Sequence, residues 1–209
     1  MEFIRYPATR MSTSRRSLIY GIGYNDASYM THYIDENGQR MRCPLYQQWK
    51  TMLQRCFSKN WHNKYPTYAN CTVDLQWLYF SKFQQWAESH DWQNKDLDKD
   101  ILIAGNKHYS PNTCLWVPPD INRLLVDSGA KRGNYPIGVC KLKKAYLARI
   151  SKYGVCYTIG SFKTPEQAAQ AFLNAKANHV IQVANAFTGS LQAALLTIAD
   201  LIRSGKYYQ

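Results

Sequence analysis

The sequence predicts an α+β fold in which a strand–turn–strand–helix segment with flanking helices precedes a three-stranded antiparallel sheet packed on one helix. Three observations lead to this prediction. Residues 97–122, LDKDILIAGNKHYSPNTCLWVPPDIN, combine two short apolar runs, a glycine-containing turn and a proline-marked helix start. Residues 137–162 alternate between apolar and polar side chains in three short runs. The residues that follow change to helical spacing.

A chain of 209 residues has room for one large or two small domains. We expect an N-terminal arm and strand region at residues 1–42, a central domain at 43–127, and a C-terminal domain with a last helix at 128–209. The second boundary is placed at DSGAKRGNYP, residues 127–136, because this stretch is rich in Gly, Ser and basic residues.

The first 89 residues alternate between turn-rich and helical patterns. Residues 1–19 have four arginines without an apolar core, so they suit a basic arm or a tail without a role, and not a secretory signal. Asn37-Gly38 predicts a hairpin turn. Helices are expected at 45–57, beginning after Pro44, and at 75–89, with a polar and aromatic loop at 58–71 between them. The second helix carries an aromatic face that we assign to the core: Trp77, Phe80, Phe83 and Trp86.

The C-terminal part predicts three strands and two helices. The strands lie within 137–162, with turns near Lys143-Lys144 and Tyr153-Gly154. The first helix has Thr164 as N-cap, Pro165 just inside and Gln167 at the third position. Its small apolar face can lie close to a sheet: Ala168, Ala171, Phe172 and Ala175. The last helix is expected at about 190–203.

Positive charge gathers in the C-terminal part of the chain. The net charge is +12, and residues 128–209 carry eleven Lys or Arg against two Asp or Glu, whereas residues 1–44 and 45–127 have net charges of only +2 and +1. This distribution is typical of a nucleic-acid-binding module attached to a near-neutral domain, so double-stranded DNA is the expected partner. The sequence has no run of about 20 apolar residues, so we expect no membrane span and a cytoplasmic location.

The cysteines leave two interpretations open. The six residues, at positions 43, 56, 71, 114, 140 and 156, form no CxxC pair and therefore do not indicate a zinc ribbon. Cys43, Cys56 and Cys71 could form an irregular zinc site together with His62. The alternative is that they are isolated buried thiols.

Residues 98–122 resemble the HNH, or ββα-metal, endonucleases of bacteriophages, and within them a group in which a basic residue replaces the histidine. The resemblance rests on LDKD, on GN and on YSPNTCLWVPPDIN. The preceding WKTMLQRC and YPTYANCTVDLQWLYFSKFQQW are similar to the usual neighbours of this motif, so the resemblance extends over residues 43–126. It implies a ββα-metal motif in a phage protein of the host cytoplasm.

The resemblance assigns roles to single residues. Asp98 matches the aspartate that binds the metal, and Asn122 matches the second ligand on the helix. Lys99 stands where the family has the histidine that activates water, and Thr113 where it has an asparagine that steadies the loop. His108, in the turn, is a substitute base if the hairpin folds it inward.

These substitutions favour weak or absent catalysis. Asp98 and Asn122 offer the oxygen ligands that Mg²⁺ requires, so Mg²⁺ is the expected cofactor if the site is active, and none otherwise. The attacking water must lose a proton, usually to a histidine. A lysine is cationic unless deeply buried, so Lys99 is a poor base although it can hold a phosphate. Losing a general base typically costs about 10² to 10⁴ in rate.

Residues 135–178 resemble the Apetala2/ethylene-response-factor DNA-binding domain. The resemblance rests on Gly138-Val139, on AYLARI, on the run IGSF from Ile159 and on the alanine-rich helix. It implies a sheet that enters the major groove and a helix that covers its back. Alternation then places these side chains against the helix: Val139, Ala148, Ile150, Tyr157 and Ile159. It places these on the DNA side: Cys140, Leu142, Arg149, Ser151 and Thr158. Phosphates are assigned to the lysines: Lys141, Lys143, Lys144, Lys152 and Lys163.

Three functions follow from these expectations. We favour a phage DNA-binding protein derived from an HNH homing-type endonuclease, with catalysis weak or lost. The alternatives are an active Mg²⁺-dependent nicking endonuclease and a basic interaction protein that acts on a host factor. Lys99 separates the first two, and the salt dependence of DNA affinity separates the third from both.

Overall fold

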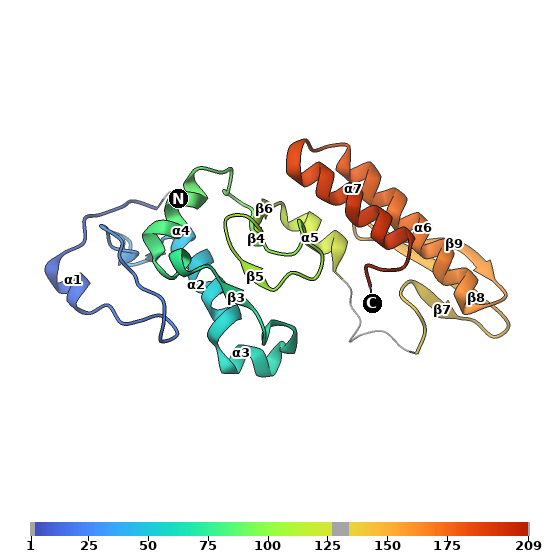
Figure 1. Cartoon of the computed structure of the whole chain (residues 1–209), viewed down its shortest axis with the longest axis horizontal. Helices are drawn as coiled ribbons and strands as arrows, with labels where there is room; N and C mark the ends of the chain where they lie inside the picture. The colour runs from blue at the N-terminus through green and yellow to red at the C-terminus, as the bar shows by residue number, and fades with distance from the viewer. Residues whose placement is uncertain (1–2, 127–133, 209) are drawn as a thin grey trace. The chain divides into compact units, whose positions relative to one another are not determined.

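The computed structural model describes residues 3–126 and 134–208. The chain divides into two compact units, Met1–Asp100 with Gly105–Trp116, and Ile101–Ala104 with Val117–Gln209. Both units mix helices with small sheets, which confirms the predicted α+β class (Figure 1). The boundary predicted at 127–136 falls largely on residues 127–133, which lie outside the described residues.

The N-terminal segment packs on the first unit. Helix α1 (Arg10–Ser14) is closed by a capping box, because Thr9 and Ser12 exchange side-chain and backbone hydrogen bonds. Phe3 and Ile19 lie against the hydrophobic core. The guanidinium of Arg16 donates to three backbone carbonyls at 2.8–3.1 Å: those of Asn25, Ala27 and Tyr29. The expectation of a free arm or tail is therefore wrong, because these contacts satisfy buried carbonyls and cover apolar surface.

A β-hairpin follows, as predicted. Strand β1 (His32–Ile34) pairs antiparallel with β2 (Arg40–Arg42). The N–H of Asp35 donates to the carbonyl of Gln39 at 2.9 Å, and Gly38 adopts φ +76° in the turn between them. Glycine is suited to that left-handed conformation because it has no Cβ.

Two helices form the aromatic core of the first unit. Helix α2 (Pro44–Phe57) begins with proline in its first turn, as predicted, and buries one side. Trp49 in this helix is fully buried, and its Nε1 donates to the carbonyl of Trp77 at 2.7 Å. Helix α4 (Phe80–Glu88) adds Phe80 and Phe83, which are fully buried, while Trp86 packs at the edge. The predicted aromatic core is thus confirmed.

Two expectations about local structure are wrong. Residues 58–71, expected as a loop, contain α3 (Lys59–Lys64) and the 3₁₀ turn η1 (Pro66–Tyr68), since Ser58 caps the N–H of Trp61. The helix expected over 75–89 is split into the 3₁₀ turn η2 (Leu75–Leu78) and α4. The split occurs at Tyr79, because the backbone of Tyr24 pairs with both sides of it, accepting from Phe80 at 3.0 Å and donating to Leu78 at 2.8 Å.

The segment that resembles a nuclease forms short strands and a helix. Strand β4 (Asp96–Asp98) pairs with β6 (Leu115–Val117), and helix α5 (Pro119–Leu125) follows. Strand β5 (His108–Tyr109) lies between β4 and β6 in the sequence, but it pairs with β3 (Thr72–Val73) in a separate parallel sheet. The predicted order of strand, turn, strand and helix is therefore present, with one additional strand in the turn.

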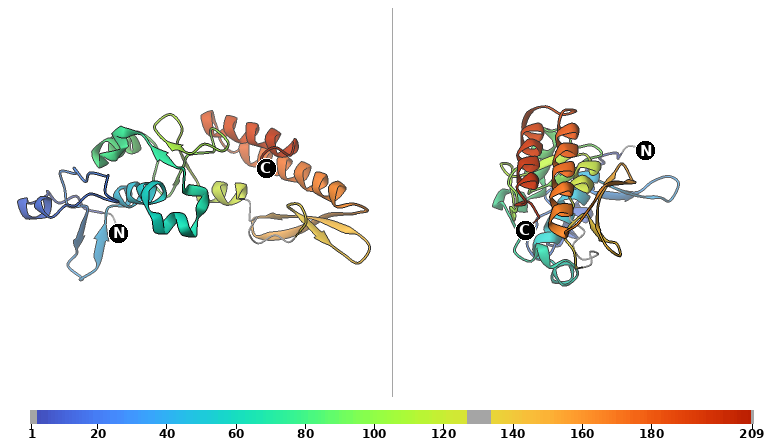
Figure 2. Two further views of the ribbon diagram at one scale, coloured as in Figure 1. Left: turned by 60° about the horizontal axis from the view of Figure 1, so that its bottom comes forward. Right: turned by 90° about the vertical axis from the view of Figure 1, so that its right-hand side faces the viewer.

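The second unit contains the predicted three-stranded antiparallel sheet, in the order β7 (Val139–Lys141), β8 (Tyr146–Lys152) and β9 (Val155–Phe162). Helix α6 (Pro165–Ala184) begins at Thr164, whose Oγ1 accepts from the N–H of Gln167. Ala168 and Phe172 of this helix pack on the sheet. Helix α7 (Gly189–Arg203) packs along α6, so that α6 lies between α7 and the sheet (Figure 2). Within the described part of the chain, no helix is both long and apolar enough to cross a membrane.

Candidate nucleic-acid interface

The face of the β7–β8–β9 sheet opposite α6 is open and built from alternate residues of each strand. Residues paired directly across an antiparallel sheet share a face. Arg149 pairs with Thr158, and Ser151 pairs with Cys156; all four side chains are exposed. Cys140 and Ser161 flank Leu147 on the same face. We call this set the outer face: Cys140, Leu147, Arg149, Ser151, Cys156, Thr158 and Ser161. Cys140, Arg149, Ser151 and Thr158 thus lie where alternation predicts.

The opposite face packs on α6 as predicted, with one exception. Ala148 and Ile150 are buried, and Val139 and Ile159 pack against them. Tyr157 pairs with Ile150 yet is 49% exposed. The strand register shifts by one residue after Ala148, and the first residues of β9, 155–158, are all exposed beyond the part that α6 covers. The expectation that Tyr157 packs on the helix is therefore wrong.

The predicted phosphate-binding lysines occupy three kinds of position. Lys143 and Lys144 are exposed in the β7–β8 turn, and Lys163 is exposed after β9. Leu142 belongs to that turn and not to the strand, with its N–H bonded to the carbonyl of Ala145 at 2.8 Å. Lys141 has its Nζ 3.9 Å from the ring centroid of Tyr146, on the face that α6 covers.

Lys152 lies at the end of β8, near helix α6. Burial and the positive charge of Lys152, followed by that of Lys176, lower the pKa of His179. Lys152 is therefore beside the helix, whereas Arg149 lies on the open face and Lys143 and Lys144 lie in the turn at one end of the sheet. Residues 134–165 contain six Lys or Arg and no Asp or Glu, so no carboxylate on this stretch offsets their charge.

In the segment that resembles a nuclease, the two predicted metal ligands belong to different compact units. Asp98 ends β4 in the first unit, and its Oδ1 accepts the N–H of Asp100 at 2.9 Å. Asn122 lies in α5, in the second unit. Their convergence on one metal ion stays a prediction.

Lys99 is a buried residue. It is 6% exposed, and its Nζ forms an ion pair with Asp100 Oδ2 at 2.9 Å. The same Nζ lies 5.9 Å from the ring centroids of Tyr68 and Tyr109, within the range of a cation–π contact. These contacts place its charge inside the first unit.

The turn after β4 is held by side chains. His108 pairs with Thr72, with its Nδ1 2.9 Å from Thr72 Oγ1. Thr113 Oγ1 donates to the carbonyl of His108 at 2.7 Å and accepts the N–H of Ser110, so Thr113 fixes the backbone of this loop. Asn106 binds the carbonyls of Lys99 and His108 at 2.6 and 2.7 Å and accepts the N–H of His108. Sequence reasoning missed Asn106, although an asparagine after a glycine is a usual turn residue.

The charges around Asp98 do not favour a divalent cation. Arg55 is buried near it; burial opposes the charge, but Tyr109, Tyr68 and Asp98 outweigh burial and raise the pKa of Arg55. The guanidinium therefore stays positive, whereas the charge of Lys99 is balanced by its ion pair with Asp100. A Mg²⁺ ion at Asp98 would have to compete with the positive charge of Arg55 for this carboxylate.

The proposed zinc ligands are not gathered. His62 Nε2 lies 2.8 Å from the carbonyl of Arg55, and Cys43 Sγ lies 3.4 Å from the hydroxyl of Tyr29. Burial raises the pKa of Cys56 to about 12, which keeps that thiol protonated. Within the described ranges, no three His, Cys, Asp or Glu side chains form a group that could hold a metal ion.

Comparisons with protein-family models, with curated proteins and with solved structures found no match to this chain.

Proposed function

We propose that the chain is a DNA-binding protein that holds duplex DNA against the outer face of its three-stranded sheet and has little or no nuclease activity. The observation that carries the proposal is the charge of residues 134–165, which have six basic and no acidic side chains. Lys and Arg bound to phosphates release condensed counterions, which supplies most of the affinity of such surfaces. Arg149 is the basic residue at the centre of the open face.

The outer face supports two kinds of DNA contact. Lys143 and Lys144 project from the exposed turn and suit phosphate contacts, which position a protein without reading sequence. Arg149 has donors that match the major-groove edge of guanine, the commonest specific contact of arginine. Ser151 and Thr158 add hydroxyls beside it.

Two contacts in the first unit support the proposal of weak or absent catalysis. The position of the general base is occupied by Lys99, buried and paired with Asp100. The substitute base, His108, is hydrogen-bonded to Thr72. An active Mg²⁺-dependent nicking endonuclease is the alternative, and the order of β4, β6 and α5 supports it. A basic protein that acts on a host factor is the second alternative, because the same basic surface would serve it.

The binding test uses the full chain and a labelled 20-base-pair duplex at several salt concentrations. Replacing Lys143, Lys144 and Arg149 by alanine should reduce the slope of log affinity against log salt by about 2, since the two lysines are assigned to phosphates and each phosphate contact contributes about 0.9. The matched control replaces three exposed lysines of the first unit: Lys59, Lys64 and Lys82. An equal effect of both triple variants contradicts the assignment, and native affinity that is insensitive to salt favours the host-factor alternative.

The catalytic test incubates supercoiled plasmid with the native chain and Mg²⁺ or Mn²⁺, with EDTA as the blank. We expect no nicking above the blank, and DNA binding that survives Asp98→Ala. Metal-dependent nicking that Asp98→Ala abolishes would establish the endonuclease alternative.

A further inference from the structure

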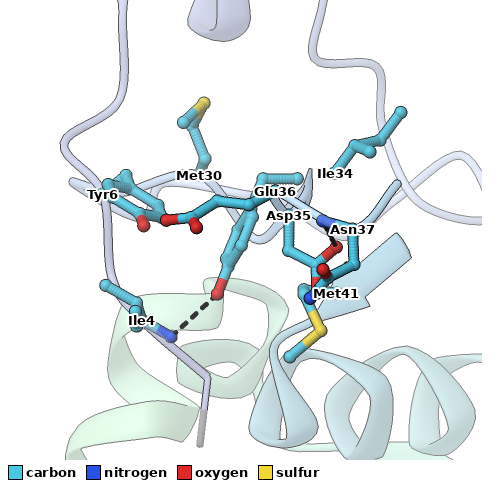
Figure 3. Close-up of a pocket in the computed structure, with 9 residues that line it drawn as sticks. Ile4, Tyr6, Met30, Ile34, Asp35, Glu36, Asn37 and Met41 are labelled. Atoms are coloured by element: carbon cyan, nitrogen blue, oxygen red, sulfur yellow. Dashed lines mark hydrogen bonds between the residues drawn. The ribbon is translucent and has the colours of Figure 1, made fainter. Parts of the chain in front are cut away.

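A cavity of about 450 Å³ lies between the N-terminal segment and the β1–β2 hairpin of the first unit (Figure 3). This volume falls in the range of sites that bind small molecules or single side chains. Its lining combines aromatic, thioether and acidic groups: Ile4, Tyr6, Met30, Tyr33, Asp35 and Glu36. It is an acidic site on a chain whose net charge is +12.

Asp35 carries an unbalanced negative charge at this cavity. Its Oδ1 accepts the N–H groups of Asn37 and Gln39 at 3.0 and 2.7 Å, which fixes the hairpin turn. Its Oδ2 is shielded from solvent and has no hydrogen-bond partner among the described residues. Within the same described ranges, no ion pair involves Asp35 or Glu36. A cation in the cavity would offset the charge of Asp35 without touching the shielded Oδ2, and the carboxylate of Glu36 is exposed and open to direct contact.

The other walls suit the stem of a long cationic side chain. The rings of Tyr6 and Tyr33 meet edge to face with centroids 4.9 Å apart, and the hydroxyl of Tyr33 accepts the N–H of Ile4 at 3.1 Å. The side chain of Glu36 extends toward Tyr6 (Figure 3). A carboxylate and an aromatic ring therefore lie close to each other in the cavity wall. Cations bind tyrosine ring faces, and the aliphatic stems of Lys and Arg pack on apolar surface.

The surface around the cavity is apolar and uncovered. Ile4 is 55% exposed and Ile34 is 68% exposed. A free metal ion or small amine would leave both side chains in water, whereas the residues next to a basic side chain in a polypeptide would cover them. Both side chains line the cavity, so a polypeptide bound there would remove their apolar surface from water.

We propose that this cavity binds a lysine or arginine side chain of an extended segment of a partner protein. The ammonium or guanidinium lies at Asp35 and Glu36, the stem lies against Tyr6 and Tyr33, and the flanking apolar residues of the partner cover Ile4 and Ile34. This site is independent of the proposed DNA interface and has the opposite charge.

The test follows methionine methyl resonances of the full chain labelled with ¹³C at the methionine methyl groups. Met30 and Met41 line the cavity, while Met52 is 1% exposed in the core and is the internal reference. The probes are the capped tripeptide Leu-Lys-Leu, its Leu-Gln-Leu analogue and free spermidine. Because the chain as a whole repels cations, binding of the lysine peptide reports a local acidic site. We expect that peptide to shift Met30 and Met41 and to leave Met52 unchanged.

Variants identify the group that binds the cation. Asp35→Asn keeps the acceptor for the N–H groups of Asn37 and Gln39 but removes the charge. It should therefore lower the affinity for the lysine peptide by at least about tenfold. Asp91→Asn makes the same change at an exposed residue paired with Lys95 and should have no effect. If the Met52 resonance shows that Asp35→Asn is misfolded, Glu36→Gln decides, and it must weaken the lysine peptide.

Three results overturn the proposal. The first is equal shifts of Met30 and Met41 with the lysine and glutamine peptides. The second is tighter binding of spermidine than of the lysine peptide, which would assign the cavity to a free polyamine. The third is unchanged peptide affinity in both folded acidic-residue variants.

Discussion

Gly138 couples the stability of the C-terminal sheet to the position of its central arginine. Gly138 precedes β7 and adopts φ +75°, and a Cβ added there would overlap the ring of Phe172. Phe172 is 5% exposed between α6 and the sheet, so its ring cannot yield without opening this core. The carbonyl of Gly138 also accepts the N–H of Arg149 at 2.8 Å. The change Gly138→Ala should therefore destabilise the sheet and displace Arg149.

The size of the effect follows from two terms. A left-handed conformation costs a non-glycine residue about 1–2 kcal/mol. Forcing an extra methyl group into a packed core costs about 1–3 kcal/mol. Gly138→Ala should thus lose about 2–5 kcal/mol. Gly154→Ala is the matched control, because Gly154 has φ +81° in the β8–β9 turn but open space around it. It should lose only the conformational part, about 1–2 kcal/mol.

Amide hydrogen exchange measures this difference within the sheet. The six tryptophans all belong to the first unit, so tryptophan fluorescence would report the wrong part of the chain. We expect exchange at residues 139–162, with the amide of Arg149 as the direct reporter, to be faster in Gly138→Ala than in Gly154→Ala. DNA affinity should fall in the same order under conditions in which both variants are folded. Equal exchange in the two variants would refute the argument from overlap with Phe172.

Three further predictions concern buried or exposed reactive groups. Burial lowers the pKa of Lys176 from 10.5 to about 8 while its Nζ donates to the carbonyl of Leu124. Between pH 8 and 10.5 the unfolded chain therefore binds more protons than the folded chain, so the free energy of unfolding should rise with pH. Urea unfolding followed by circular dichroism should show a gain of up to about 3 kcal/mol over this range for the native chain relative to Lys176→Met. A difference between the two proteins that does not change with pH would contradict this. Lys99→His should not raise plasmid nicking, because the side chain is buried against Tyr68 and Tyr109; metal-dependent nicking by that variant would show that the position reaches DNA. Mass spectrometry after brief maleimide treatment should show two adducts, at Cys140 and Cys156, since the other four thiols are buried; bound duplex should protect both, and unprotected labelling of the complex would count against the outer face as the DNA contact.

Sequence reasoning succeeded where local pattern decides the structure. Alternation through 137–162 and the Thr164-Pro165 start predicted the sheet and α6, because both signals are contained in neighbouring residues. Asn37-Gly38 predicted the hairpin for the same reason. Pro44 likewise predicted where α2 begins.

The failures arise from contacts between distant residues. Tyr24 interrupts the helix expected over 75–89 by pairing with the backbone around Tyr79. No residue within 75–89 indicates this pairing, so the sequence of that segment alone could not predict the interruption. Arg16 fixes the N-terminal segment through three carbonyls, whereas its sequence alone suits a free basic arm. Tyr157 is exposed because the register shift after Ala148 and the extent of α6 are properties of the assembled sheet. Long-range pairing of this kind overrides local propensity.

Lys99 shows how burial changes the interpretation of a motif. The resemblance to HNH endonucleases assigns Lys99 to a catalytic position, and an exposed lysine there could hold a phosphate. In the structure the charge of Lys99 is balanced by an ion pair with Asp100. Releasing Lys99 toward DNA would break its ion pair with Asp100 and would remove a cation from the ring of Tyr109, while Arg55 would stay beside Tyr68. The burial and ion pair of Lys99 thus give a structural reason for a lysine at this position. Under the proposed function, the strand–strand–helix segment is a scaffold and DNA binds to the basic sheet of the second unit.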